Sequence, residues 1–133
     1  MKYVYMLDAN IISDLVRNPD GSAAEQVRKK EGERLCTSII VASELRYGVE
    51  KKQSKRLRDQ VERVFSGIDI LPFDHPADHH YARIRTELES TGKSIGPNDL
   101  LIAAHACATG TILVTNNLKE FSRVPGLQIE NWL

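Results

Sequence analysis

Four carboxylates in this sequence occupy positions that suit metal-ion chemistry: Asp8, Glu44, Asp99 and Glu120. Carboxylates that surround one point repel each other, and this repulsion raises their pKa values unless a cation lies among them. Oxygen ligands alone suit Mg²⁺ or Mn²⁺, which proteins hold through one or two carboxylates and several waters. If the four acids meet in the fold, the expected chemistry is phosphodiester hydrolysis, in which the ion polarises a phosphoryl oxygen and activates a water.

Asp99 lies in the first turn of a predicted helix over residues 97–109, which Gly96-Pro97 opens. Pro suits the first turn of a helix, because its missing N–H would have no partner there. Residues 100–104 are apolar on every side, so we expect this helix to be buried all round. The free N–H groups and the helix dipole stabilise an anion at this end. We expect an ionised Asp99 near the core; the alternative is that Asp99 only caps its own helix.

Glu44 lies on a predicted helix that Thr37 or Ser38 caps and that runs to about residue 52. A period of 3.6 residues places Glu44 within a broad apolar arc, which consists of Ile40, Val41, Leu45, Tyr47, Gly48 and Val49. The opposite side of the helix consists of Ala42, Ser43 and Arg46. A carboxylate on a buried side is costly unless a charged partner meets it. A buried salt bridge and a metal ion both satisfy this requirement.

The spacing from Asn117 to Glu120 has two interpretations. In a capping box, Asn117 is the N-cap of a short helix, and the side chain of Glu120 reaches back to its N–H. In the alternative, the first turn of this helix rises from the acidic site. Glu120 is then an outer member of the acidic cluster, and Asn117 hydrogen-bonds a bound water. We favour the second interpretation.

Strands and helices alternate along the predicted chain. Strands are expected at residues 2–7, 34–36, 68–72, 111–115 and 127–130, and helices at 11–17, 22–31, 38–52, 54–66, 76–90, 97–109 and from about 118. This order favours an α/β fold with a parallel sheet, helices on both faces and a single domain over residues 1–133. Ligands bind at the carboxyl ends of such strands. Asp8 and Thr115 end two strands, and the N-terminus of helix 97–109 reaches the same edge.

Net charge, cysteine content and the length of apolar runs limit the classes of protein to which the chain can belong. The 18 basic and 18 acidic residues cancel, which argues against a protein that coats nucleic acid through its net field. Cys36 and Cys107 show no pairing pattern and read as small buried hydrophobes of a reducing cytoplasm. No apolar run is long enough for a membrane helix or a signal peptide. A cluster near the start of helix 76–90 is interpreted as a solvated helix start rather than a metal site; it consists of Asp74, His75, His79 and His80.

Five short motifs, in this order along the chain, resemble those of PIN-domain ribonucleases, and the closest type is the VapC toxin of bacterial toxin–antitoxin pairs. The motifs are residues 6–11 (MLDANI), Ser38 through Glu44-Leu45 to Gly48, residues 96–99 (GPND), residues 114–117 (VTNN) with Phe121, and residues 127–132 (LQIENW). The resemblance covers nearly the whole chain. It implies that Asp8 and Asp99 are the principal Mg²⁺ ligands and that Glu44 is a third acid. It also implies that Asn10 and Thr115 are supporting polar groups.

The same resemblance implies a biological role. Relatives of this type cleave structured RNA, and enterobacterial ones act on initiator tRNA in the anticodon stem-loop. The family also implies a homodimer, a VapB-type antitoxin whose C-terminal segment lies across the active site, and contact with DNA only through that antitoxin. The helices of residues 38–66 would form part of the antitoxin groove. With zero net charge, RNA binding should involve few phosphates, and the candidate contacts are Arg46, Lys51, Lys93 and Lys119.

Two departures from the family keep alternatives open. Ala9 stands where relatives usually have Thr, and Asn117 stands where many have Asp. The first removes a hydroxyl that could orient Asp8, and the second leaves open whether one or two ions bind. A catalytically weakened subunit that mainly binds the antitoxin is therefore an alternative. An aspartyl-phosphate phosphotransferase is a further one, although Asn10 replaces the second acid that it needs and Glu130-Asn131 supplies no Lys after the last strand.

Overall fold

A computed structural model describes residues 2–30 and 32–133. Their central feature is a five-stranded parallel sheet with the strand order β3-β2-β1-β4-β5. The strands are β1 (Tyr5–Leu7), β2 (Leu35–Ser38), β3 (Asp69–Leu71), β4 (Ile112–Val114) and β5 (Ile129–Glu130). Each is shorter than predicted or shifted by up to two residues. β1 and β4, far apart in sequence, are neighbours, with Leu7 opposite Val114.

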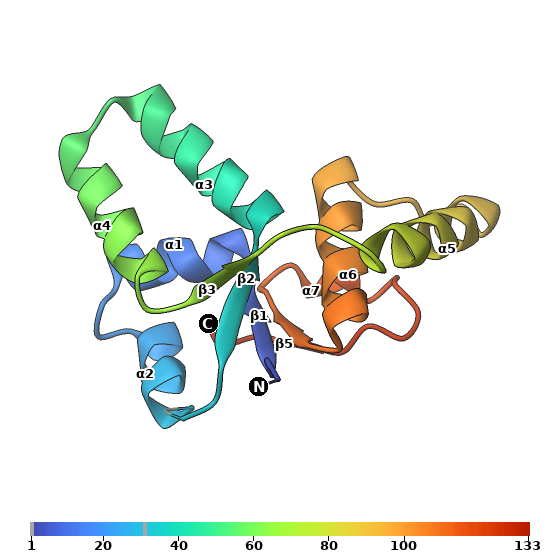
Figure 1. The fold of residues 1–133 in the computed structure, drawn as a ribbon, viewed down its shortest axis with the longest axis horizontal. Coiled ribbons are helices and arrows are strands. Elements are labelled where there is room, and N and C mark those ends of the chain that lie inside the picture. Colours follow the sequence, from blue (N-terminus) through green and yellow to red (C-terminus); the bar gives the residue numbers. More distant parts are fainter. Residues whose placement is uncertain (1, 31) are drawn as a thin grey trace.

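Helices lie on both faces of the sheet, as the alternating sequence pattern predicts. They are α1 (Ala9–Arg17), α2 (Ser22–Lys29), α3 (Ile39–Lys52), α4 (Lys55–Phe65), α5 (Ala77–Ser90), α6 (Pro97–Thr109) and α7 (Leu118–Phe121). Figure 1 shows α1 to α4 on one side of the central strands and α5 and α6 on the other. The predicted helix end at Glu31 lies outside the described residues. No helix in the described ranges is long and apolar enough to span a membrane.

The core lies around β1, β4 and α6. Met6, Leu7, Leu113 and Val114 are completely buried, which suits parallel strands covered on both faces. In α6, residues 102–106 are buried in succession, so the prediction of a helix buried all round is confirmed. α6 begins at Pro97 and ends before Gly110 in the left-handed conformation, which is the common glycine cap.

The predicted apolar arc of α3 was partly wrong. Tyr47, expected on the buried side, is 67% exposed, and Ala42, expected on the outer side, is completely buried. The face that packs is centred on Val41, Ala42, Leu45 and Val49, almost opposite Tyr47. α3 and α4 extend from the sheet as a pair (Figure 1), so the outer side of α3 has no neighbour in the described chain. Glu44 lies at the border of the buried face and is half-buried.

Candidate active site

Asp8 follows β1 and is the N-cap of α1, because its Oδ1 accepts a hydrogen bond from the N–H of Ala9 at 2.8 Å. Its Oδ2 accepts from the hydroxyl of Thr115 at 2.8 Å and from Nδ2 of Asn10 at 3.2 Å. Asp8 is only 4% exposed. Burial raises the pKa of this carboxyl group, while the three hydrogen bonds act in the opposite direction. Asp8 is therefore held in a fixed position by neutral donors.

A second layer of hydrogen bonds fixes those donors. The hydroxyl of Thr115 accepts from the N–H of Asn117 at 3.0 Å and lies 3.4 Å from Nδ2 of Asn10. Oδ1 of Asn10 accepts from the N–H of Asn116 at 3.0 Å. These bonds join the start of α1 to the end of β4. Thr115 and Asn10 therefore stand beside Asp8 as predicted, and Asn116 is a contributor that sequence reasoning missed.

Asp99 and Glu120 meet beside the first residue before α6. Oε1 of Glu120 accepts from the N–H of Gly96 at 2.7 Å, and Oε2 accepts from Nδ2 of Asn117 at 2.7 Å. A Cβ atom on Gly96 would lie 3.6 Å from Oε1 of Glu120 and 3.7 Å from Oδ2 of Asp99. Burial raises the pKa of Asp99, and the carboxyl group of Glu120 raises it further, so the two groups are close neighbours. They thus belong to one cluster at the start of α6.

The capping box predicted as an alternative for Asn117 and Glu120 does not form in the described chain. The N–H of Asn117 bonds to Thr115, and the side chain of Asn117 makes no cap hydrogen bond to α7. The carboxylate of Glu120 instead reaches across to α6. This placement agrees with the interpretation that Glu120 belongs to the acidic cluster.

Among residues 2–30 and 32–133, the N–H of Gly96 and the charge of Arg123 lower the pKa of Glu120. Burial and the neighbouring acids of the cluster raise the pKa values of Asp8, Glu44 and Asp99. Partial burial raises the pKa of Asp99 to about 7, and the hydrogen bond and charge of Glu120 add to this, followed by the charges of Asp8 and Glu44. The direction of this rise runs against the expectation that Asp99 is ionised, which stays a prediction. Burial and neighbouring charge outweigh the helix dipole.

Glu44 completes the cluster from α3. Burial raises its pKa first, the charge of Asp8 adds to this, and a hydrogen bond from Asn98 acts in the opposite direction. No Lys or Arg forms a salt bridge with Glu44 within residues 2–30 and 32–133. The buried salt bridge that the sequence left open is therefore not found there. Sequence reasoning gave Asn98 no role, although its place next to Asp99 in the first turn was a signal.

The donor set fits a hard divalent ion. It consists of carboxylate oxygens, the ligands that Mg²⁺ and Mn²⁺ prefer. Burial raises the pKa values of Asp8, Glu44 and Asp99, and the neighbouring carboxylates add to each rise. Asp8 and Asp99 come from different elements and face the same edge of the sheet, so they could hold one ion between them.

A buried pair joins the helices that carry two of these acids. Nδ1 of His105, on α6, lies 2.7 Å from the hydroxyl of Ser38. That hydroxyl also caps α3 by accepting from the N–H of Ile40 at 3.0 Å. The pair therefore fixes α6, which carries Asp99, against the start of α3, which carries Glu44. Sequence reasoning identified Ser38 as a cap but missed His105.

The basic residues predicted to contact RNA differ in their surroundings. Arg46 donates to both carboxylate oxygens of Glu62, at 2.8 and 3.0 Å, and its guanidinium lies 4.9 Å from the ring centre of Phe65. Lys51, Lys93 and Lys119 are exposed. The guanidinium of Arg46 is thus engaged within the chain, whereas the three lysines face solvent.

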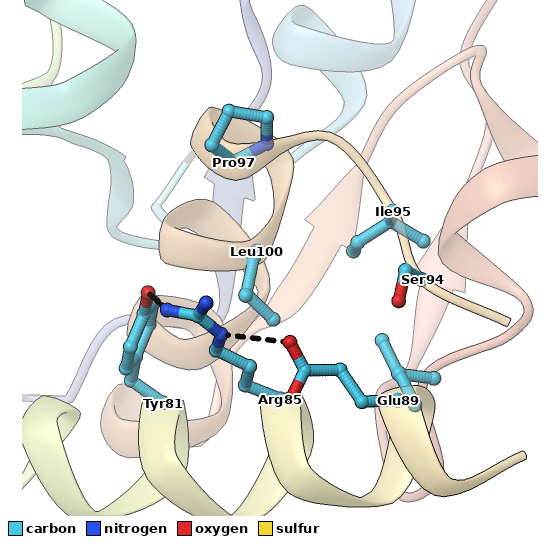
Figure 2. A pocket seen from close by; sticks show the side chains of 8 residues that line it. Tyr81, Arg85, Glu89, Ser94, Ile95, Pro97 and Leu100 are labelled. Carbon is cyan, nitrogen blue, oxygen red and sulfur yellow. Dashed lines mark hydrogen bonds and ion pairs between the residues drawn. The ribbon is translucent and has the colours of Figure 1, made fainter. Parts of the chain in front are cut away.

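The acidic cluster does not lie in the pocket between α5 and the start of α6. That pocket has a volume of about 180 Å³, and Figure 2 shows Pro97 and Leu100 of α6 along it. Its polar side consists of Arg85, which donates to Tyr81 at 3.0 Å and to Glu89 at 3.1 Å. None of the four acids lines it. The acids stand instead at the carboxyl edge of the sheet.

Comparison with known proteins identifies a family. Residues 5–127 match the PIN domain family. Ribonuclease VapC2 of Rickettsia felis is 41% identical over 131 residues, which cover 97% of this chain and 98% of the relative. The tRNA(fMet)-specific endonuclease VapC of Shigella flexneri is 41% identical over 129 residues, which cover 96% and 97%. The fold is also similar to that in the crystal structure of VapBC2 from Rickettsia felis bound to a promoter DNA fragment, with a TM-score of 0.92, 38% identity and coverage of 98% and 99%.

Proposed function

Because this chain belongs to the PIN-domain family, as a ribonuclease of the VapC type, we propose that it hydrolyses phosphodiester bonds of structured RNA with Mg²⁺ or Mn²⁺. The observation that carries the proposal is the cluster of four carboxylates around the sheet edge, with the pKa of Asp99 raised to about 7. A cluster of this kind is unfavourable without a cation and favourable with one. PIN-domain nucleases generally depend on divalent metal ions.

We assign different tasks to the residues of the site. Asp8 and Asp99 would hold the ion, which supplies polarisation of a phosphoryl oxygen and activation of a water. Thr115 and Asn10 keep Asp8 in place through their hydrogen bonds. Glu44 and Glu120 add negative charge at the rim of the cluster. When the ion binds, the proton on Asp99 must leave, so the metal-bound state forms most readily above about pH 7.

The proposed substrate is a structured RNA, and initiator tRNA is the first candidate. Support comes from the Shigella flexneri relative, which is named for action on tRNA(fMet). The exposed Lys51, Lys93 and Lys119 are available for phosphate contacts, whereas Arg46 is paired with Glu62. An open edge with few cations suits recognition by shape and local charge rather than by the net field of the protein.

The proposed protein partner is a VapB-type antitoxin. A groove of about 400 Å³ lies between α1, α3 and α4 and ends at Glu44; its apolar lining consists of Val16, Leu45, Val49, Leu57 and Val61. An antitoxin segment in this groove would approach the acidic site and block it. We also propose a homodimer, for which the exposed Tyr47 on the outer side of α3 is a candidate contact. We propose that DNA is bound only through the antitoxin and that the complex acts in the cytoplasm.

Cleavage of defined RNAs by the purified chain tests this proposal. We expect Mg²⁺-dependent cutting of initiator tRNA within the anticodon stem-loop, with slower cutting of an elongator tRNA. EDTA should stop the reaction, and Asp99→Asn should abolish it. Asp20→Asn, the same chemical change at an exposed acid outside the cluster, should cleave normally. Failure to cut any RNA in Mg²⁺ or Mn²⁺, with antitoxin binding intact, would favour the weakened subunit that Ala9 suggests.

A further inference from the structure

The start of α5 carries three metal-ligating side chains that the proposed nuclease site does not use: His75, Asp78 and His79. One donor atom of each lies within 4.8 Å of the donor atoms of the other two. The residues stand where the segment after β3 enters α5, and none of the four acids lies on α5. The sequence favoured a solvated helix start here. The structure agrees that all three side chains are exposed, and it adds their proximity.

The imidazole rings of His75 and His79 are spaced like two rings that bind the same metal ion. Their ring centres are 5.1 Å apart, and their planes make an angle of 77°. A tetrahedral ion at about 2.0–2.1 Å from one nitrogen of each ring places the ring centres about 5 Å apart. Aromatic rings in edge-to-face contact adopt similar spacings without an ion. The ring pair therefore points to a metal only together with a third donor.

Asp78 supplies that third donor. Its Oδ1 lies 3.2 Å from Nδ1 of His75, and the two side chains are 66% and 72% exposed. A cation between these atoms takes the place of the proton that they share, and water from the open side completes the coordination. The next histidine is placed differently, because Nδ1 of His80 lies 3.1 Å from the guanidinium of Arg83. Substitution of His80 therefore serves as the control for substitution of His79.

We propose that His75, Asp78 and His79 bind a transition-metal dication of the Zn²⁺, Ni²⁺ or Cu²⁺ class. Imidazole ligands favour these ions, whereas sites made of carboxylate and water favour Mg²⁺ and Mn²⁺. The protein then has two cation sites of different chemistry, one at the acidic cluster and one at the start of α5. Occupancy of the second ties the segment before α5 to the first turn of the helix, and it stabilises the folded state by mass action.

Metal titration of the purified chain, free of any polyhistidine tag, tests this proposal. Co²⁺ absorption and Zn²⁺ calorimetry count the ions bound by the wild type, His79→Ala, Asp78→Asn and His80→Ala. The wild type and His80→Ala should bind one more Zn²⁺ than His79→Ala, and Asp78→Asn should bind that ion at least about tenfold more weakly. Histidine ring signals in NMR spectra should shift on Zn²⁺ addition for His75 and His79 but not for His80.

The outcomes separate this site from the nuclease site. Asp8→Asn should keep the imidazole-bound ion, and His79→Ala should keep Mg²⁺-dependent RNA cleavage. Equal Zn²⁺ stoichiometry in the wild type and His79→Ala would overturn the proposal. Equal loss of binding in His79→Ala and His80→Ala would also overturn it, because a general surface affinity of imidazoles would then explain the result. Neither result depends on whether the protein cuts RNA.

Discussion

The acidic site has two sides that are built in opposite ways. Asp8 is buried, and three neutral groups donate hydrogen bonds to its carboxylate. Asp99 is half-buried, and a close neighbour of its carboxyl group is a second carboxyl group, that of Glu120. Burial raises the pKa on both sides. Hydrogen bonds counteract the rise at Asp8, whereas at Asp99 the neighbouring charge enlarges it.

This difference gives the two sides different roles: one holds a carboxylate in position, and the other carries closely spaced negative charges. The fold itself fixes Asp8, so its geometry does not depend on an ion. Asp99 and Glu120 repel each other when both are ionised, and one proton relieves that repulsion in the metal-free state. A divalent ion relieves the same repulsion at higher pH. We therefore expect Asp8 to determine where the ion lies and the Asp99–Glu120 pair to determine when it binds.

Removing the charge of Asp8 or of Asp99 should have the largest effect on RNA cleavage. Asp8→Asn and Asp99→Asn should each reduce cleavage at least about a thousandfold, because loss of an ion ligand removes several kcal/mol of transition-state stabilisation. Their effects on the metal-free fold at pH 8 should differ in sign. Asp99→Asn should raise the melting temperature by relieving repulsion, whereas Asp8→Asn should lower it, because an amide group then faces the donors of Thr115 and Asn10. Equal shifts in melting temperature would contradict the proposed difference between the two sides.

Thr115→Val tests the positioned side alone. It deletes the hydroxyl that donates to Asp8 and accepts from the N–H of Asn117. Loss of a buried hydrogen-bonding group should lower the free energy of unfolding by about 1–3 kcal/mol, measured by urea denaturation, and should reduce cleavage as well. Thr111→Val, at a buried threonine away from the acids, should leave cleavage unchanged. Normal cleavage by Thr115→Val would mean that Asp8 needs no such support.

Glu120→Gln tests the charged side alone. A Gln can still accept from Gly96, and loss of the charge relieves the repulsion from Asp99, so the fold should lose no stability, while cleavage should fall about tenfold. Without the charge of Glu120, the pKa of Asp99 should fall from about 7 toward its ordinary value of 3.8. The acid limb of the pH–rate profile should therefore move to lower pH. Glu89→Gln, on the exposed side of α5, should alter neither quantity, and an unmoved acid limb in Glu120→Gln would return Glu120 to a purely structural role.

Metal and pH should act on stability through the same carboxyl group. The pKa of Asp99 is about 7 in the fold and 3.8 when unperturbed, so its protonation stabilises the metal-free fold below pH 3.8. That contribution is lost as pH rises through about 7. At pH 8, Mg²⁺ should raise the melting temperature in thermal unfolding scans, and at pH 4.5 this gain should shrink because protons compete with the ion. Asp99→Asn should remove both the pH trend and most of the Mg²⁺ effect.

The smallest predicted effect concerns RNA phosphates. Binding of initiator tRNA should show a shallow salt dependence that corresponds to about three or four phosphates. Lys93→Ala and Lys119→Ala, close in sequence to Asp99 and Glu120, should each reduce the log–log salt slope by about one. Arg46→Ala should change it less, because Arg46 is already paired with Glu62. A slope as steep as that of a strongly basic RNA-binding protein would contradict this expectation.

Local signals explain what could be predicted from the sequence. Pro97 and Gly110 bound α6 at the predicted residues, because these two residue types have strong conformational preferences. The strand order brings Asp8 and Thr115 together by general rules of parallel sheets. Membership of Glu120 in the acidic cluster followed from charge and spacing.

Long-range packing explains what could not be predicted. The helical period of α3 predicts how wide its buried face is, but not which neighbouring element that face contacts. The sequence therefore placed Tyr47 on the buried side and Ala42 on the outer side, the reverse of what the structure shows. The contact between Ser38 and His105 joins residues 67 positions apart. Nothing in the sequence around either residue indicates that the other is its partner. The proximity of Asp99 and Glu120 depends on how α7 lies against the start of α6, which no local pattern encodes.

The pairing of β1 with β4 has a consequence for protein synthesis. Asp8 is made early, but the hydroxyl that holds it belongs to Thr115, 107 positions later, and Glu120 comes later still. Until residues 112–120 have left the ribosome, β1 lacks one neighbouring strand, and the acids cannot meet. A nascent chain with this strand order cannot assemble its acidic site before Glu120 has been made and has left the ribosome.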